Sequence, residues 1–286
     1  MGTSIATFFV RRKAGGGKKL IGVPFVAALF FQVLSRLLYL IGGLMYECSD
    51  LSNNDYINLS IAANAMIHLA NWALLVTFVY VLNSMLLRQL KNSSSGPKIV
   101  SWILIGVMAA VMVADLAFSS YISTSSKYWD FDFALTILIA RAFSLTADIL
   151  WMISVIISAA FSLSSISALR SRRLPGGDLI GWVAALFVTL FIYSVLGIVF
   201  SSLFFWPDQS LISNEALLAL SFISAFSQVL TFVALMCIAK HISWSQTIEK
   251  TELVYVPVMQ QQQATDAYGN GQQGYYQQTP ELVHAK

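Results

Sequence analysis

The feature that most constrains this chain is a set of six long apolar runs separated by short polar loops. Each run holds at least the ~20 residues that a helix needs to cross the ~30 Å hydrocarbon core of a bilayer. The runs cover residues 20–45, 57–87, 99–122, 133–168, 179–206 and 216–239. Hydrocarbon offers no hydrogen-bond partner, so each span must pair its own backbone groups, as a helix does. The sequence predicts an all-α polytopic transmembrane helix bundle with six membrane-spanning helices and the lipid bilayer as its partner.

The composition agrees with this fold class. Hydrophobic residues make up 57% of the chain and charged residues only 11%, and the mean hydropathy is +0.70. A water-soluble domain could not bury that much apolar surface in one core. The formal net charge is only +3, which gives no reason to expect a nucleic-acid partner.

The basic residues fall almost only in every second loop, and this predicts the orientation. They are Arg11, Arg12, Lys13, Lys18, Lys19, Arg88, Lys91, Lys98, Arg170, Arg172, Arg173, Lys240 and Lys250. The alternate loops are acidic and hold Lys127 as their one basic residue. Because cytoplasmic loops retain lysine and arginine, we expect both termini in the cytoplasm. The pattern fits the plasma membrane and an internal membrane equally.

Three regions follow from these boundaries. Residues 1–19 form a basic cytoplasmic N-terminus, and residues 20–243 form the six-helix transmembrane domain. Residues 244–286 are rich in glutamine and tyrosine and poor in aliphatic side chains. Such a segment cannot bury enough apolar area to fold alone, so we expect a disordered cytoplasmic tail that a cytoplasmic partner could bind.

The fourth run is longer than a bilayer requires. As a straight helix, residues 133–168 would extend ~54 Å, so the span must tilt, bend or continue into the cytosol. Its second half repeats serine at helical spacing, at Ser154, Ser158, Ser162 and Ser165. Small residues at such spacing allow close helix contact in lipid, which favours a packing seam here.

Polar residues inside the spans are the candidate functional residues. Counting the helical rise places five of them in one layer in the outer half of the membrane: Arg36, Asn64, His68, Asp115 and Arg141. Asp148 and Gln228 fall nearer the midplane. Together these seven residues are the predicted ligand-binding set.

The cost of charge in hydrocarbon indicates that these groups are paired or solvated. A bare charge facing lipid costs about 3 kcal/mol or more. The simplest pairing sets Arg36 or Arg141 against Asp115, with Asp148 bonded to Arg141 or Gln228. Two interpretations remain open: ion pairs that only fix helix packing, or a pocket for a small-molecule or lipid ligand open to the outer side.

Catalytic and metal-binding patterns are absent from the sequence. It contains no His-Glu-x-x-His, no Gly-x-Ser-x-Gly and no phosphate loop. Of its three histidines, only His68 falls inside a span, which argues against a metal site built on imidazoles. We therefore expect neither an enzyme nor a bound cofactor.

Several features together resemble the polytopic membrane proteins common in fungal genomes. They are the basic Lys18-Lys19, the intramembrane Arg36 followed by Gly42-Gly43, the short loops and the Gln/Tyr-rich tail. Such proteins often have seven spans and an outer N-terminus, which would make Ile5 to Val10 the remnant of an additional first helix. No activity is established for that family, so the resemblance implies a class and no site residues.

The function that these patterns favour is a receptor-like or sensor protein with a polar pocket in the outer half of the bundle. Polar stripes on all six spans also fit a small transporter or channel. A structural membrane organiser acting through the serine seam is a further alternative.

Overall fold

A computed structural model of the chain describes residues 15–48, 53–90, 95–125, 131–174, 176–203 and 214–244. Within these ranges every regular element is a helix, and six helical segments are long and apolar enough to cross a membrane. The predicted all-α bundle of six spans is confirmed. The chain is a multi-pass integral membrane protein. Most of the predicted tail, and residues 1–14 of the basic N-terminus, lie outside the described residues.

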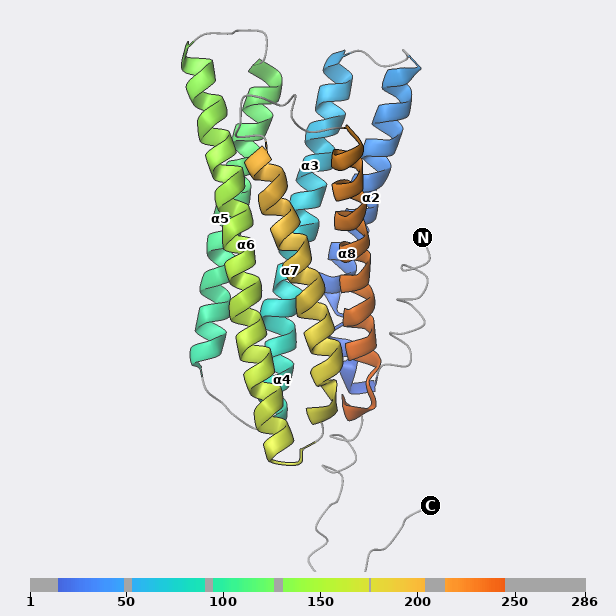
Figure 1. The fold of residues 1–286 in the computed structure, drawn as a ribbon, viewed down its shortest axis with the longest axis vertical. Coiled ribbons are helices and arrows are strands. Elements are labelled where there is room, and N and C mark those ends of the chain that lie inside the picture. Colours follow the sequence, from blue (N-terminus) through green and yellow to red (C-terminus); the bar gives the residue numbers. More distant parts are fainter. Residues whose placement is uncertain are drawn as a thin grey trace, which may run out of the picture. The chain divides into compact units, whose positions relative to one another are not determined.

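The six spans run in alternating directions (Figure 1). The first three are α2 (Val23–Glu47), α3 (Asn53–Leu75) continued by η2 (Val76–Leu82) and α4 (Asn83–Gln89), and α5 (Gly96–Ser125). The last three are α6 (Phe131–Ser171), α7 (Ile180–Leu203) and α8 (Asn214–Lys240). As its sequence predicts, α6 is longer than a bilayer requires, since its 41 residues extend ~60 Å.

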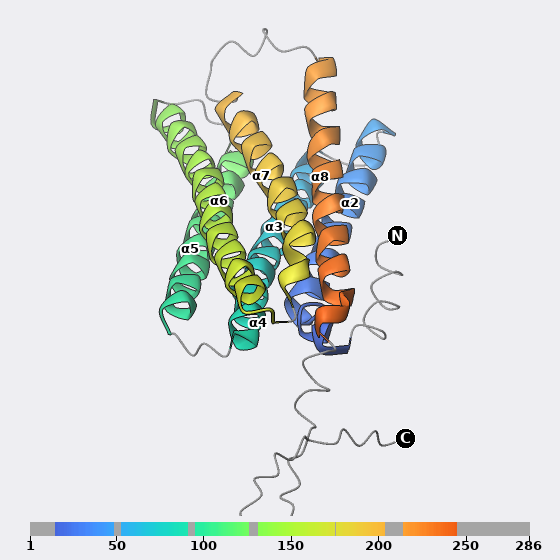
Figure 2. The same cartoon turned by 60° about the horizontal axis from the view of Figure 1, so that its bottom comes forward.

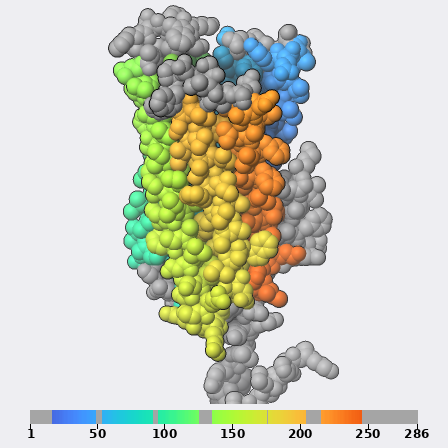
Figure 3. All heavy atoms as spheres, in the orientation of Figure 1, coloured from blue at the N-terminus to red at the C-terminus, as the bar shows by residue number. Residues whose placement is uncertain are grey.

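Each span packs mainly on its neighbours in the chain. The contacts of α2 are chiefly with α3, and α3 also packs on α5. The remaining spans continue the series from α5 through α6 and α7 to α8, as Figures 1 and 2 show from two directions. In Figure 3 the spans α6, α7 and α8 lie side by side over one face. The first and last spans, α2 and α8, pack much more sparsely against each other.

Most charged residues at the helix ends separate to opposite ends of the bundle, and Asp178, between α6 and α7, is an acidic residue on the basic side. One end, called the basic end below, carries Lys18, Lys19, Arg88, Lys98, Arg170 and Lys240. The other, called the acidic end, carries Glu47, Asp55 and Glu215. Between the ends, large apolar side chains point outward, among them Phe222 with 72% of its surface exposed. Such outward apolar surface suits contact with lipid.

The apolar core lies in the half of the bundle next to the basic end. Its fully buried side chains come from the start of α2, from the turn just before α7 and from the ends of the second, fourth and sixth spans, for example Phe25, Phe78, Leu169, Leu179 and Leu235. Of the predicted site residues, four lie nearer the acidic end: Asn64, His68, Asp115 and Arg141. The other three, Arg36, Asp148 and Gln228, lie near the middle of their spans.

Three short 3₁₀ turns lie at the basic end among the described residues: η1 (Gly15–Lys19), η3 (Gly177–Leu179) and η5 (Ile242–Trp244). The turn η1 packs on α8 and on η5. A Cβ at Gly17 would lie 1.9 Å from the carbonyl oxygen of Ala239, so only glycine permits this approach. The indole Nε1 of Trp244 donates to the carbonyl of Ile238 at 2.6 Å.

The second span contains a π-helical stretch, η2, that packs on the serine seam of α6. The Asn83 amide Nδ2 donates to the Val79 carbonyl at 2.9 Å and to Ser158 Oγ at 3.0 Å. Ser162 Oγ donates to Asn83 Oδ1 at 2.7 Å, and Ser158 Oγ donates to the Phe78 carbonyl at 3.1 Å. Polar side chains thus satisfy backbone carbonyls of the altered helical geometry. Ser154, Ser158, Ser162 and Ser165 are all buried, so the predicted seam is confirmed.

The substitution Asn83→Ala should destabilise the bundle by about 1–2 kcal/mol, because Ser158 and Ser162 would lose their buried partner. The expected result is a lower melting temperature of the purified protein in detergent. Ser167→Ala is the matched control. Ser167 lies on α6 like Ser158 and Ser162 but is exposed, so its substitution should leave the melting temperature unchanged. An equal effect of both substitutions would contradict this account of the seam.

Candidate functional site

The seven predicted site residues occupy separate places in the structure. Arg36 and Gln228 line a cavity between α2 and α8, called the lateral groove below. His68, Asp115 and Asp148 line a second cavity inside the bundle, called the interior chamber below. Asn64 and Arg141 line neither of the two. The single polar pocket expected from the depth count is therefore two sites.

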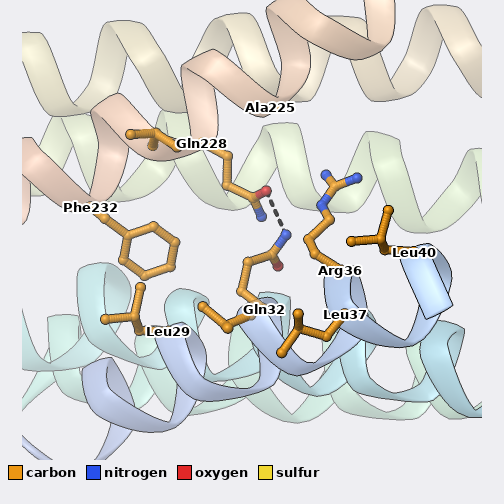
Figure 4. Close-up of a pocket in the computed structure, with 10 residues that line it drawn as sticks. Leu29, Gln32, Arg36, Leu37, Leu40, Ala225, Gln228 and Phe232 are labelled. Carbon is orange, nitrogen blue, oxygen red and sulfur yellow. Dashed lines mark hydrogen bonds between the residues drawn. The ribbon is translucent and has the colours of Figure 1, made fainter. Parts of the chain in front are cut away.

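The lateral groove has a volume of about 480 Å³ and a mostly apolar wall. Leu37 and Leu40 line it from α2, and Val229 and Phe232 line it from α8. Its polar side chains come from the same two helices, with Gln32 and Arg36 on α2 and Gln228 on α8 (Figure 4). The spacing of four residues puts Gln32 and Arg36 on one face of α2.

A buried amide pair joins the two walls of the groove. Gln32 Nε2 donates to Gln228 Oε1 at 2.7 Å, and the dashed line in Figure 4 marks this bond. Both side chains are more than nine-tenths buried. The remaining oxygen of Gln32, Oε1, has no hydrogen-bond partner among the described residues. The pair fixes the distance between α2 and α8 and leaves one acceptor available next to the groove.

Arg36 is the charged group of the groove. Its side chain is exposed and extends from α2 toward α8. No carboxylate lies within 4.0 Å of it in the part of the chain that the structure describes. Arg36 is about 20 Å along α2 from its first residue, near the middle of the span. An uncompensated charge at that depth costs about 3 kcal/mol or more.

The groove is closed toward the basic end and open on its side. Phe25 and Phe232 pack edge to face at 5.6 Å between ring centroids and close it on the basic side. Beyond Arg36, α2 contacts α3 instead of α8: the Tyr39 hydroxyl donates to Asn64 Oδ1. On α8, Phe226 is 56% exposed in the same region. The groove therefore opens sideways, where lipid would lie.

The interior chamber has a volume of about 240 Å³ and receives residues from α3, α5, α6, α7 and α8. His68 Nε2 lies 3.5 Å from Asp115 Oδ2. Ser201 Oγ donates to Asp148 Oδ2. A Cβ at Gly197 would lie 3.1 Å from Asp148 Oδ1, so this glycine lets α7 approach the carboxylate.

The predicted pairing of Asp115 with an arginine is wrong. Its ionisable partner is His68, because α3 lies between α2 and α5 and presents His68 where Arg36 was expected. Arg141 is half-buried and has no carboxylate within 4.0 Å among the described residues. Asp148 bonds across the helix interface to Ser201 instead of along its own helix to Arg141.

The ligand-binding set predicted from the sequence leaves out four residues that the structure places at these sites. Gln32 and Tyr193 belong to the polar stripes that the sequence predicts on their spans, and Gln32 lies one turn from Arg36. Trp151 lies one turn from Asp148 but has no polar pattern of its own. Tyr193 lines the chamber and donates to Asn71 Oδ1 at 3.4 Å. Ser201 lies close to the acidic end of α7 and carried no distinguishing pattern.

No protein-family model, curated protein or solved structure matches this chain. The resemblance to fungal membrane proteins stays a prediction. Within the described ranges, no group of three histidine, cysteine or acidic side chains is arranged to hold a metal ion. The function must therefore be argued from the two sites themselves.

A double-mutant cycle should show that His68 and Asp115 are energetically coupled. His68→Phe removes the partner of a buried carboxylate, and Asp115→Leu removes the carboxylate itself. We expect each single substitution to destabilise the protein and the double variant to lose less than their sum, with a coupling of about 0.5–2 kcal/mol. The measurement is thermal unfolding in detergent. Strict additivity would mean that the two side chains do not interact.

Proposed function

We propose that this chain is a receptor-like membrane protein that binds an amphipathic ligand with an anionic head group in the lateral groove. The observation that carries the proposal is Arg36, an intramembrane guanidinium without a carboxylate partner among the described residues. A charge inside a membrane costs free energy, so a protein that keeps one there generally uses it for its function. A bound anion would remove that cost.

The wall of the groove fits the two parts of such a ligand. A carboxylate or phosphate head could accept two parallel hydrogen bonds from the planar guanidinium of Arg36. The amide pair of Gln32 and Gln228 lies next to it and offers further hydrogen bonds. Leu37 and Leu40 provide apolar contacts for an acyl chain. Because the groove opens sideways, a lipid-like molecule could enter from the bilayer.

Two observations favour binding over the alternatives. The fully buried apolar side chains of the core lie between the interior chamber and the basic end, which argues against a path across the membrane. The serine seam of α6 contacts η2 and α4 of the same chain, so it is not available to a protein partner. Transport and scaffolding therefore have less support than ligand binding.

Replacement of Arg36 should abolish recognition of the anionic head. We expect sodium oleate to raise the melting temperature of the purified protein in neutral detergent. Oleyl alcohol, which has the same chain without the charge, should raise it much less. In Arg36→Gln the affinity for oleate should fall about tenfold to a hundredfold, the range that a lost charge-assisted hydrogen bond gives.

Arg141→Gln is the matched control for this experiment. It removes another intramembrane arginine, one that does not line the groove, and should bind oleate like the unsubstituted chain. The proposal fails if Arg36→Gln keeps its affinity for oleate, or if both arginine variants lose it equally.

We infer further that the basic end faces the cytosol, with both chain ends on that side. The segregation of lysine and arginine to this end supports the orientation. The acidic end would then face away from the cytosol. The basic loops and the predicted tail of residues 244–286 would transmit the bound state to a cytoplasmic partner.

Cys48 provides a direct test of the orientation. Its thiol is exposed at the acidic end of α2, whereas Cys237 is only partly exposed within α8. In a Cys237→Ser variant expressed at the cell surface, a membrane-impermeant maleimide should label Cys48 without permeabilisation. A Lys19→Cys, Cys48→Ser, Cys237→Ser variant should react only after permeabilisation. The reverse pattern would invert the topology.

A further inference from the structure

The interior chamber carries an excess of negative charge. Asp115 and Asp148 both line it, and the basic side chain that lines it with them is His68. No lysine or arginine lies within 4.0 Å of either carboxylate in the described ranges. His68 and Ser201 satisfy one oxygen of each acid. The electrostatic balance of the chamber therefore favours a positively charged occupant.

Two deeply buried polar groups in the chamber wall lack partners. Asp115 is only 5% exposed, and its Oδ1 has no hydrogen-bond partner among the described residues. Trp151 is also 5% exposed, and its indole Nε1 has no acceptor there either. Buried polar groups are nearly always paired, because an unpaired one costs free energy. An occupant that both donates to Asp115 and accepts from Trp151 would satisfy them.

The aromatic side chains narrow the chemical class of this occupant. Trp151 and Tyr193 meet edge to face at 6.4 Å between centroids, and both line the chamber. Aromatic faces attract organic cations through their quadrupoles. The acids are not grouped with a third ligand in the way a metal ion requires, as far as the described residues extend. A small organic ammonium ion therefore fits this wall better than a metal ion.

We propose that the interior chamber is a second binding site, which takes a small primary ammonium ion carrying a hydroxyl group. The ammonium donates to Asp115 Oδ1 and Asp148, and the hydroxyl oxygen accepts the indole N–H of Trp151. The volume of about 240 Å³ accommodates a molecule of a few heavy atoms, since one water occupies ~30 Å³ in the liquid.

This site is separate from the lateral groove, although one helix serves both. Ser224 of α8 lines the chamber, and Gln228, one turn further along α8, lines the groove. The two proposed ligands carry opposite charges, because the groove presents the cation Arg36 and the chamber presents the acids Asp115 and Asp148. Loss of binding at one site can therefore be distinguished from loss at the other.

The test uses the full chain in neutral detergent with ethanolamine as the probe. Three compounds serve as controls. Ethylamine lacks the hydroxyl group, and ethylene glycol lacks the positive charge. Sodium chloride is added at the same ionic strength. Binding is measured by calorimetry and thermal shift. We expect ethanolamine to bind at least about tenfold more tightly than ethylamine or ethylene glycol, a ratio equivalent to one good hydrogen bond.

Substitutions assign the two contacts. Asp115→Asn should lower the affinity for ethanolamine about tenfold or more. Trp151→Phe keeps an aromatic ring, although a smaller one, and removes the N–H, so it should make ethanolamine and ethylamine bind equally while leaving ethylamine affinity unchanged. Glu215→Gln, at the exposed start of α8, is the control and should bind like the unsubstituted chain. Because Trp151→Phe leaves both carboxylates of the chamber in place, it provides an independent test if Asp115→Asn does not fold.

Three outcomes overturn the proposal. Stabilisation by sodium chloride equal to that by ethanolamine would identify a simple ion site. Equal binding of ethanolamine and ethylene glycol would mean that charge is not recognised. No binding of ethanolamine to a folded protein would mean that the unpaired groups are satisfied by water alone.

Discussion

Hydrocarbon cannot donate or accept a hydrogen bond, and this constraint determines how the spans of this chain find one another. Apolar side chains contact lipid and protein with similar free energy, so they select a neighbour only weakly. Polar side chains must find a partner within the protein. Gln32 with Gln228 joins the first and last spans, His68 with Asp115 joins the second and third, and Asn83 with the serine seam joins the second and fourth.

The two halves of the bundle have different physical roles. Near the basic end, large side chains such as Phe78 and Leu86 are fully buried, and the turns η1 and η5 cover the helix ends. The groove and the chamber lie further from that end, and their walls include charges and unpaired polar atoms. Another cavity of about 240 Å³ lies near the basic end, but its wall includes no charged side chain. The buried apolar side chains hold the helix positions, whereas the groove and the chamber keep charged groups in costly environments that a ligand would relieve.

The number of spans, their approximate limits and the serine seam could all be predicted from the sequence, because each depends on periodicity or length within one segment. The depth count also correctly brought His68 and Asp115 to the same level. Depth does not give direction around the bundle, however. Arg36 lies near that level too but faces α8, so its predicted pairing with Asp115 was wrong.

The site residues that the sequence did not reveal are those whose role depends on a neighbouring helix. Trp151 has the pattern of an apolar core residue, and its unpaired N–H becomes visible only when α6 is placed against α7. Gly197 has the helical spacing of the polar stripe of the fifth span, but only the structure places it beside Asp148. Such contacts join distant parts of the sequence, and no local spacing encodes them.

The π-helical stretch in the second span also sets how far one half of that span is rotated about the helix axis relative to the other half. On its basic side, Asn83 faces α6, and on its acidic side, His68 faces Asp115 of α5. Since each helical residue turns the chain by about 100°, deleting a single residue from η2 would rotate His68 away from Asp115 if Asn83 kept its place. The chamber therefore depends on the residue count of a segment that does not line it.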